Sequence, residues 1–486
     1  ERGFRMSDIG QSQLDGRGVR RQRGTPAAQP DGHRRRVLIP ASTSAFLSLT
    51  IGFATLITIG TLFLMLPISS VKDGAAPFIV SVFTATSAVC VTGLVVVSSG
   101  AYWTWFGQAV LVVLMFMGGL GIMSAGLVML AAIGRRITLN QHLLVRETLG
   151  AGSLGSAVRL GKYVLIFAVA AQLVGVIVLF LRLIFEYSPA QALWQSLFHS
   201  VSAFNNAGFS IFPESTSLSA FKSDPTVLAT IGVGILIGAL SFPVLNEVLR
   251  RRKLSTWSLD TRLVVLGTIG LWLIGIATVV IFEFGNHATL GAMPLGEKIS
   301  NGLFLATTAK TAGFSTISFG DTRAGTDFLF MLMMFVGGAS GSVAGGIKIN
   351  TAMVLVVATV AAIRGRPRTE IHKREIPYAQ VVRALSVLVL AATGVVLFIV
   401  LLSFTERFKI DAGLFDLGDT MFEIVSAFGT VGLSRGITPD LSDPGKLVVT
   451  LAMYVGRLGP LTIGLGLALR ERRSVYRYAS ERVRIG

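Results

Sequence analysis

Four short segments of this sequence each place a glycine after small or polar residues, at roughly regular intervals along the chain. They are Val91-Thr92-Gly93-Leu94, Asn206-Ala207-Gly208-Phe209, Thr311-Ala312-Gly313-Phe314 and Thr430-Val431-Gly432-Leu433. Because glycine accepts a positive φ, neighbouring carbonyl oxygens can point the same way without a Cβ clash. Four such loops around one axis would replace the hydration shell of a cation with backbone oxygens. The chemistry that these segments indicate is therefore cation coordination.

The predicted coordinating layers take four consecutive residues from each segment. They are Cys90, Val91, Thr92 and Gly93; Asn205, Asn206, Ala207 and Gly208; Lys310, Thr311, Ala312 and Gly313; and Gly429, Thr430, Val431 and Gly432. A helix-compatible stretch too short to cross a bilayer precedes each segment, which is typical of a re-entrant half-helix. Non-helical backbone at membrane depth is tolerated where it is buried in protein or lines an aqueous path. We therefore expect these loops to line one ion pathway.

A glycine-rich stretch interrupts the long apolar segment at 326–363. Each glycine costs a helix about 1 kcal/mol relative to alanine, so we predict a break here and a movable gate. The predicted gate residues are Gly337, Gly338, Ala339, Ser340, Gly341, Ser342, Gly345, Gly346 and Lys348, together with Arg457 from the last apolar segment.

Two other interpretations of this stretch were weighed. The spacing from Gly341 to Gly346 suits a phosphate loop, but Ile347 holds the lysine position and no Ser or Thr follows Lys348. Close helix packing through small residues is an alternative for Gly337 alone, and it explains the whole cluster poorly.

Single polar residues near these segments have more than one interpretation. Arg457 stands where the other units carry Gly or Ala, and an intramembrane charge is usually functional. We expect it to donate hydrogen bonds to gate-loop carbonyls and to add a positive barrier, with snorkelling to the interface as the alternative. Lys310 either pairs with a nearby acid or is solvated at the mouth of the pathway. For the side chains of His199, Glu423 and Cys90, packing or capping is favoured over ligation.

The sequence offers no set of His, Cys, Asp and Glu with metal-ligand spacing and no nucleophile–base motif. We therefore expect no catalytic residues and no cofactor in this chain, and K⁺ only at the filter residues. A lone cysteine cannot form an internal disulfide. An enzyme is thus the least supported class.

Composition identifies the elements that must position these residues. Of 486 residues, 52% are hydrophobic and only 14% are charged, against about 25% charged in a soluble domain. The net charge of +17 lies in alternate inter-helix segments, while acids offset the bases in the segments between them. This is the positive-inside pattern with both termini cytoplasmic, and it is favoured over nucleic-acid binding.

The fold class that follows is an all-α polytopic membrane protein with eight spanning helices, in four repeated helix–pore-loop–helix units around one axis. We expect first helices at 42–67, 163–187, 260–284 and 379–404, and second helices at 104–134, 226–250, 326–363 and 446–470. The predicted organisation is a disordered basic cytoplasmic tail at 1–37, which lacks the apolar region of a signal peptide, followed by units at 38–136, 137–253, 254–370 and 371–486. The last two contain the gate loop and the C-terminal tail, respectively.

These motifs resemble the Trk/Ktr/HKT superfamily of potassium transporters over nearly everything from residue 38 onward. The resemblance rests on the sequences at 84–94, 202–209, 311–316 and 456–462. The eight-helix count resembles the Ktr branch and its KtrB membrane subunits, because Trk-type subunits usually carry an additional N-terminal helix pair. The long basic N-terminal tail departs from that pattern.

The resemblance implies a homodimer in the cell membrane, in contact with lipid, with one ion pathway per protomer. It also implies potassium uptake, often sodium-stimulated, and a cytoplasmic KtrA/TrkA-type regulatory ring that would carry the nucleotide (ATP or ADP). The alternative is the potassium-translocating subunit of an ATP-driven pump, which shares the fourfold plan but usually has extra terminal helices.

Overall fold

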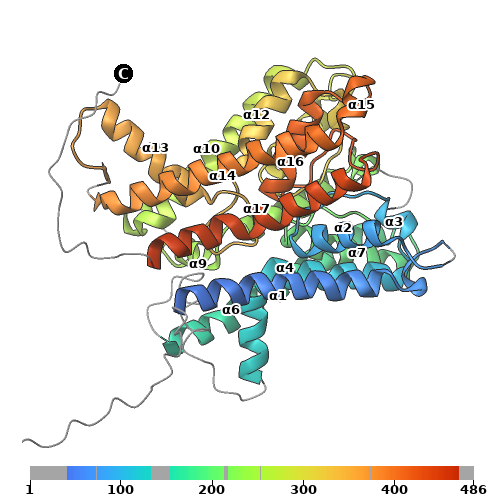
Figure 1. Ribbon diagram of the computed structural model, residues 1–486, viewed down its shortest axis with the longest axis horizontal. Helices are drawn as coiled ribbons and strands as arrows, with labels where there is room; N and C mark the ends of the chain where they lie inside the picture. Colours follow the sequence, from blue (N-terminus) through green and yellow to red (C-terminus); the bar gives the residue numbers. More distant parts are fainter. Residues whose placement is uncertain are drawn as a thin grey trace, which may run out of the picture. The chain divides into compact units, whose positions relative to one another are not determined.

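The protein is built almost entirely from helices in the computed structural model, which describes residues 41–72, 74–132, 154–212, 217–251, 253–372 and 374–469 (Figure 1). The four first helices are α1 (Ala41–Leu64), α6 (Leu154–Leu183), α10 (Leu259–Thr278) and α14 (Tyr378–Thr405). The four shorter helices that follow them are α2 (Phe78–Val89), α7 (Pro189–Phe204), α11 (Leu295–Thr308) and α16 (Leu417–Gly429). The second apolar segments form α4 (Trp105–Ala132), α8 (Pro225–Ala239) with α9 (Phe242–Arg250), α12 (Ala324–Phe335) with α13 (Ile349–Ile363), and α17 (Asp443–Leu469).

Short elements connect these helices. They are η1 (Pro67–Ser69), α3 (Ser99–Tyr102), η2 (Ser219–Phe221), η3 (Leu254–Thr256), the π-helical turn η4 (Val279–Glu283), η5 (Phe319–Asp321), β1 (Glu370–Ile371), β2 (Arg374–Glu375) and α15 (Arg407–Asp411). The antiparallel β1–β2 hairpin is an exception to the expected all-α class. The predicted tail at 1–37 and the C-terminal tail beyond 469 lie outside the described residues.

Local sequence explains where several helices begin. Asp224 caps α8 by accepting hydrogen bonds from the backbone N–H groups of Thr226 and Val227 at 2.9 and 3.1 Å. Pro225 follows at the first helical position, where its missing N–H would have no partner in any case. A reciprocal capping box between Asp416 and Asp419 begins α16. Polar caps thus fix the entry into elements that carry or flank the pore loops.

Helices occupy all eight ranges expected for spanning segments, but three of the second helices are not continuous. Helix α4 has a non-helical residue at Gly121, with φ 74° and ψ 142°. The predicted helix at 226–250 is wrong as a single helix, because α8 and α9 are bent by 103° at Leu240 and Ser241. Pro243 agrees with the bend, since it has no N–H to donate to Ala239 and stands in the first turn of α9, where that N–H is not needed.

The third break is the one that the glycine content predicts. Helix α12 ends at Phe335 and α13 begins at Ile349, so the predicted gate residues 337–348 lie in the loop between them. The fourth second helix, α17, is continuous from Asp443 to Leu469. The first helix of the third unit also departs from expectation, because its last turn is π-helical.

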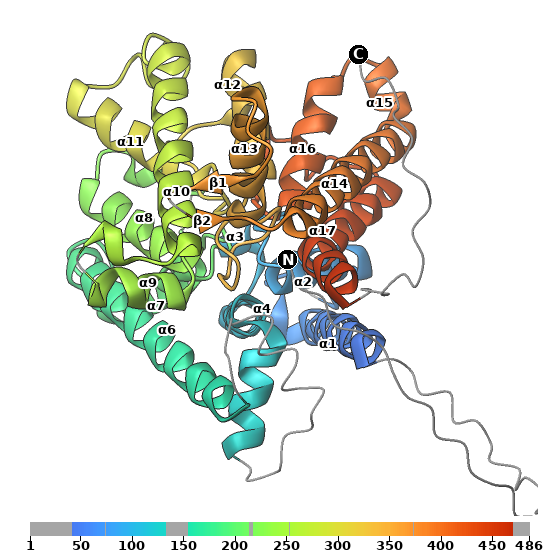
Figure 2. The same ribbon diagram turned by 90° about the vertical axis from the view of Figure 1, so that its left-hand side faces the viewer.

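The helices of successive units pack against one another in a closed cycle. Helix α4 contacts α6 and α7, α8 contacts α11, α12 contacts α16, and α17 contacts α1 and α2. The hydroxyl of Tyr454 on α17 donates to the carbonyl of Thr50 on α1 at 2.8 Å, so the last unit is bonded to the first. Figure 2 shows the blue, green, yellow and red parts of the chain following one another around the molecule.

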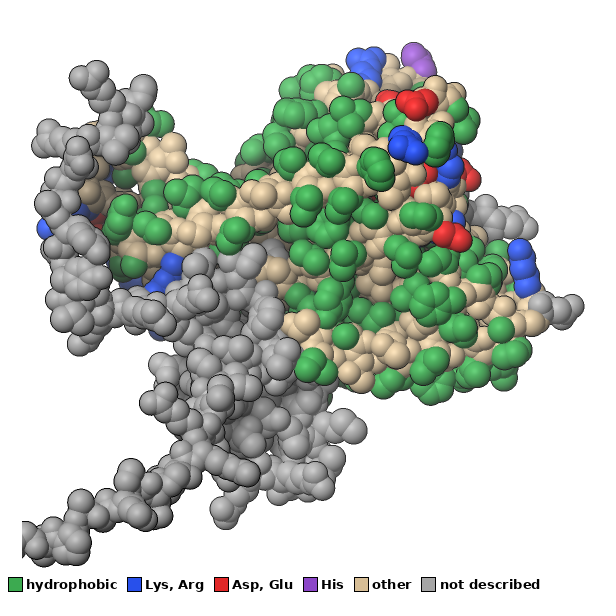
Figure 3. Space-filling model, in the orientation of Figure 1, with side chains coloured by type: hydrophobic (Ala, Val, Ile, Leu, Met, Phe, Trp, Pro, Cys, Tyr) green, Lys and Arg blue, Asp and Glu red, His purple; other side chains and the backbone are tan. Residues whose placement is uncertain are grey.

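Apolar side chains cover much of the outer surface. Figure 3 shows them over the visible face, while charged side chains gather toward the end that carries α15. Val174 on α6, Leu273 on α10 and Val396 on α14 are 62%, 55% and 60% exposed. Among the described helices, the segments long and apolar enough to cross a membrane are Gly161–Leu183, Leu259–Glu283 and Tyr378–Thr405, with the bent α8–α9 pair as a fourth if it counts as one span.

Candidate functional site

Three of the four glycine loops leave their short helices by the same turn. Val91, Asn206 and Thr430 have φ values of 56°, 56° and 49°, which are unusual for residues with a side chain. In each case the next residue donates its N–H to a carbonyl five residues back, with N···O distances of 2.8 to 2.9 Å. The backbone therefore reverses directly after each helix, before it reaches the glycine.

A serine behind each of these three loops fixes the turn. The backbone N–H of Gly93 donates to Ser87 Oγ at 3.0 Å, and that of Gly432 donates to Ser426 Oγ at the same distance. Ser202 Oγ donates to the carbonyl of Phe209 at 2.9 Å. The sequence shows a serine six residues before each of these three glycines, but it does not reveal that the serine positions the turn.

The four glycines meet in a closed ring. A Cβ built on each would lie far inside van der Waals contact of a carbonyl oxygen in the next unit. The distances are 2.4 Å from Gly93 to Ala207 O, 2.7 Å from Gly208 to Ala312 O, 2.6 Å from Gly313 to Val431 O, and 2.0 Å from Gly432 to Thr92 O. The order runs from unit one through unit four and back to unit one. Glycine is required here by close backbone approach as well as by its φ of 70° to 94°.

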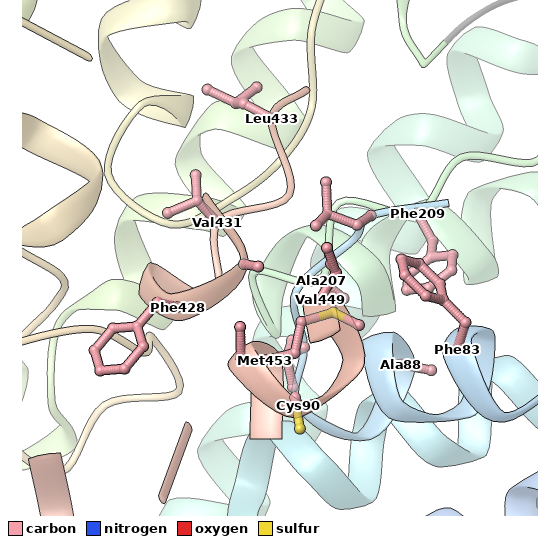
Figure 4. Packing of buried hydrophobic residues seen from close by; sticks show 14 of the residues in the cluster. Phe83, Ala88, Cys90, Ala207, Phe209, Phe428, Val431, Leu433, Val449 and Met453 are labelled. Carbon is pink, nitrogen blue, oxygen red and sulfur yellow. The ribbon is translucent and has the colours of Figure 1, made fainter. Parts of the chain in front are cut away.

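The structure thus brings the sixteen predicted filter residues together, and all of them are buried. Their side chains do not all face the ring. Cys90 belongs to a buried apolar cluster with Val449 and Met453 of α17, as Figure 4 shows. Packing is therefore the role that the structure gives its thiol, and only backbone atoms of Cys90 remain candidates for coordination.

The third loop differs from the other three. Thr311 is not among the described residues with positive φ. Ala312 N donates to Thr308 O, only four residues back, at 3.1 Å. Thr307 stands where the other units carry the bonding serine, yet its hydroxyl donates to Leu303 O at 2.8 Å and accepts from Trp272 Nε1 at 3.1 Å. The third loop therefore continues helical geometry further and is held differently.

Both interpretations of Lys310 are wrong. The residue is only 1% exposed, so it is not solvated at a mouth. Its Nζ has no hydrogen-bond partner in the described part of the chain, and no described acid pairs with it. The residue lies inside the protein because the third loop is packed on all sides, which the sequence position alone did not reveal.

His199 and Glu423 lie in short helices. Each forms hydrogen bonds with the irregular segment that follows the glycine of its own unit. Glu423 accepts hydrogen bonds from Ser434 Oγ at 2.7 Å and Thr438 Oγ1 at 2.5 Å. His199 Nε2 lies 3.1 Å from Ser210 Oγ, and its ring stacks on Phe212. These bonds agree with a packing role rather than ligation.

The gate loop bonds to the bend between α8 and α9. Ala339 N donates to Ala239 O at 3.0 Å, and Val343 N donates to Gly238 O at 3.3 Å. In a continuous helix Ala239 O would face residue 243, a proline without an N–H. The gate loop therefore satisfies carbonyls that the bend in α8–α9 leaves free.

The same loop lies directly against the fourth glycine loop. A Cβ on Gly345 would lie 1.8 Å from Thr430 Oγ1, and Gly346 has a φ of 65°. A Cβ on Gly337 would lie 1.8 Å from Gly345 O, so the two ends of the loop touch. The predicted gate and one predicted filter loop are thus in van der Waals contact.

The remaining gate residues have identified positions. Ser340 is exposed and donates its N–H to Asn350 Oδ1 at 2.9 Å. Gly341 has a φ of 76°, and Ser342 Oγ is buried without a described partner. Lys348 Nζ donates to Ala344 O at 2.5 Å, which closes the C-terminal part of the loop.

Arg457 makes the contact that the sequence predicts. Its Nη1 donates to Val343 O of the gate loop at 2.7 Å, and its Nη2 donates to Gly118 O of α4 at 3.0 Å. Arg457, which belongs to the fourth unit, therefore connects the gate loop of the third unit to α4 of the first.

Glycines at matching places in three of the second helices allow those helices to pack closely on the short helices of their own units. A Cβ on Gly118, Gly238 or Gly456 would lie 1.8 to 2.0 Å from the carbonyl oxygen of Val89, Phe204 or Phe428, respectively. These oxygens stand at the C-terminal ends of the short helices α2, α7 and α16. In each of these units the second helix can thus approach the short helix of the same unit only because a glycine, which has no Cβ, stands at the contact. In the third unit, Gly337 meets Gly345 O of the gate loop instead.

The described residues contain no group of three or more His, Cys, Asp and Glu side chains placed to hold a metal ion.

Comparison with known proteins finds similarity over most of the chain. The TrkH family, described as cation transport proteins, matches residues 33–474. The Ktr system potassium uptake protein B of Bacillus subtilis (strain 168) is 39% identical over 88% of this chain and 94% of that protein. The potassium/sodium uptake protein NtpJ of Enterococcus hirae is 34% identical over 90% of this chain and 96% of that protein.

The fold is also similar to a solved structure. The crystal structure of the potassium transporter TrkH from Vibrio parahaemolyticus matches with a TM-score of 0.68 at 18% identity, over 90% of this chain and 86% of that chain. Together with the family match over residues 33–474, this fold agrees with the resemblance inferred from the glycine motifs. The chain therefore belongs to the TrkH family of cation transport proteins and is a KtrB-like member of the Trk/Ktr potassium transporter superfamily.

Proposed function

We propose that this protein takes up potassium across the cell membrane through the ring of Gly93, Gly208, Gly313 and Gly432. The observation that carries the proposal is the closure of that ring, in which each glycine faces a carbonyl oxygen of the next unit. Carbonyl oxygens around one axis replace the hydration shell of K⁺ as it enters. The two relatives named above, described as uptake proteins for potassium or for potassium and sodium, support K⁺ as the transported ion and an involvement of Na⁺.

The proposed architecture has eight membrane crossings in four units with pseudo-fourfold symmetry and both termini in the cytoplasm. The cyclic contacts from α4 through α17 support the symmetry. The exposed apolar faces of α6, α10 and α14 support contact with lipid hydrocarbon. Basic residues concentrated in alternate connections support the orientation.

The loop from Gly337 to Lys348 is proposed to gate the pathway. It touches the fourth filter loop at Thr430, and Arg457 ties it to α4. An arginine there adds positive charge on the inner side of the ring, which opposes cation flow while the loop is closed. Movement of the loop would separate Val343 from Arg457 and open the path.

The proposed assembly is a homodimer regulated by a cytoplasmic KtrA/TrkA-type ring, which would carry the nucleotide. The similarity to a Ktr system protein supports a Ktr-type partner. This chain would supply the ion pathway. The cytoplasmic regulatory ring would favour either the closed or the open state of the gate loop.

Reconstitution into liposomes tests the proposal. Purified protein in vesicles should admit K⁺ or Rb⁺ down a gradient and discriminate against Na⁺, and external Na⁺ should raise the rate. Addition of a Ktr-type ring with ATP or ADP should change the rate without changing ion preference. Equal K⁺ and Na⁺ fluxes, or no flux with a correctly folded dimer, would refute the proposal.

A further inference from the structure

The third filter loop lacks the supports that hold the other three. It has neither the positive-φ turn nor the serine bond, and its unit lacks the close contact between second helix and pore helix. Buried polar atoms without a described partner occur in all four loops, at Thr92, Asn205, Lys310 and Thr430, so they do not distinguish the third. Because the third loop lacks the turn and the serine bond, it depends more on contacts outside its own unit's filter turn.

Helix α10 supplies one of those contacts through Trp272. The indole Nε1–H donates to Thr307 Oγ1 at 3.1 Å, while the hydroxyl itself donates to Leu303 O at 2.8 Å. One helical turn further on, a Cβ on Gly275 would lie 3.0 Å from Ala306 Cβ, so α10 and α11 are closely packed. Trp272 thus donates to the oxygen whose equivalents in Ser87 and Ser426 accept from the glycine N–H.

The other end of α10 bonds to the gate loop. Asp260 Oδ1 accepts a hydrogen bond from Asn350 Nδ2, and Asn350 Oδ1 accepts from Ser340 N at 2.9 Å. A Cβ on Gly267 would lie 3.0 Å from Ile349 Cγ1 and 2.7 Å from Met353 Cγ, so α10 also packs tightly on α13. Asp260 and Trp272 stand twelve positions apart on the same helix, a rise of about 18 Å.

We propose that α10 couples the gate loop to the third filter loop, with Trp272 as the positioning residue at the filter end and Asp260 at the gate end. The inference rests on the proposed function and adds a route by which the state of the gate alters one wall of the filter. Along this route the third loop would respond, because it lacks the serine bond and the positive-φ turn that hold the other three. Ion preference and gate state are then linked in this protein.

Rb⁺ uptake by four variants in vesicles tests the coupling. Trp272→Phe removes the N–H and frees Thr307, so the apparent KM for Rb⁺ should change at least threefold while the maximal rate stays within twofold. The same substitution in a Thr307→Val background should have no further effect, because the acceptor is absent. Asp260→Asn should change mainly the maximal rate. Leu273→Ala, at a 55% exposed neighbouring position, is the matched control and should change neither quantity.

A double-mutant cycle between Asp260 and Trp272 gives the decisive result. Residues this far apart normally act additively, so a departure of threefold or more from the product of the single effects on KM would support coupling through α10. Additive effects, or an unchanged KM in Trp272→Phe, would overturn the inference. If Gly432→Ser lowers K⁺ preference in the same vesicles while the cycle is additive, the proposed filter stands and the coupling alone fails.

Discussion

Substitution of Gly432 by serine is the sharpest test of the glycine ring. Gly432 has a φ of 94°, and a Cβ there would lie 2.0 Å from Thr92 O and 3.0 Å from Gly93 Cα. Real Cβ atoms rarely approach closer than 3.0 Å, so the Thr92 carbonyl must move by about 1 Å. That carbonyl belongs to the ring, and under the proposed function its displacement would remove one oxygen from a transported ion.

The expected size of the effect follows from two terms. The positive φ costs a residue with a side chain about 1–2 kcal/mol. Loss of one contact between a charge and a polar group costs about 1.5–3 kcal/mol. Only the second term acts on the ion, and at about 1.4 kcal/mol per factor of ten it predicts a ten- to hundredfold loss of K⁺ affinity. That factor is the upper limit for the loss of K⁺ preference over Na⁺, because Na⁺ would lose the same oxygen.

Gly436 provides a matched control, because its φ is 104° and no atom lies within 4 Å of its Cβ position. Gly436→Ser bears the same backbone cost without the clash, so it should lower stability slightly and leave ion preference unchanged. The four ring glycines should also rank by their clash distances. The loss for serine should fall in the order Gly432, Gly93, Gly313 and Gly208, whose Cβ positions lie 2.0, 2.4, 2.6 and 2.7 Å from the facing oxygens.

The assay is competitive uptake of K⁺ and Na⁺ by vesicles, supported by growth of a transport-deficient host at graded K⁺. Each variant is first checked for expression and thermal unfolding. The reasoning would be refuted if Gly436→Ser and Gly432→Ser changed ion preference equally, or if neither changed it in folded protein.

Three further predictions concern the gate and Lys310. Deleting Ser340 to Ala344 removes Val343 and with it the bonds to Gly238 and Arg457, so flux should rise several-fold and depend less on the regulatory ring; a folded deletion variant with unchanged flux would contradict the gate assignment. Arg457→Ala removes both carbonyl contacts and the charge, so maximal uptake velocity should rise with nearly constant apparent K⁺ affinity, whereas Arg457→Lys should retain the barrier; a large affinity change without a velocity change would place Arg457 at the filter instead. Lys310→Met removes a buried ammonium without a described partner and keeps the backbone carbonyl, so the unfolding midpoint measured by scanning fluorimetry should rise and K⁺ uptake should persist; a lower midpoint would show that the ammonium has a partner.

The features that sequence predicted well are those that a few residues determine locally. Apolar runs fixed the long helices, and five glycines between Phe335 and Lys348 were enough to predict the break between α12 and α13. The contact between Arg457 and the gate loop followed from the cost of a buried charge, which must find acceptors nearby.

The features that sequence did not predict depend on which segments meet. Pro243 was visible, but the 103° bend becomes tolerable only where Ala339 and Val343 bond to the carbonyls that it frees. Lys310 occupies the position of Cys90, Asn205 and Gly429, and nothing in that alignment reveals that its ammonium is buried. The hydrogen bond from Trp272 to Thr307 at the third loop likewise joins residues that are remote in sequence.

The breaks in the second helices and the arginine of α17 form one hydrogen-bonding scheme. The non-helical Gly121 lies three residues after Gly118, whose carbonyl accepts from Arg457, and the bend after Ala239 frees the carbonyls that hold the gate loop. The gate loop offers Val343 O to the same arginine. Each broken helix thus has free acceptors, and the continuous helix α17 carries the donor that needs them. Because an unpaired arginine at this depth would cost about 2.5–3.5 kcal/mol, motion of the gate loop must leave Arg457 with other partners, and Gly118 O is the acceptor that remains when Val343 moves away.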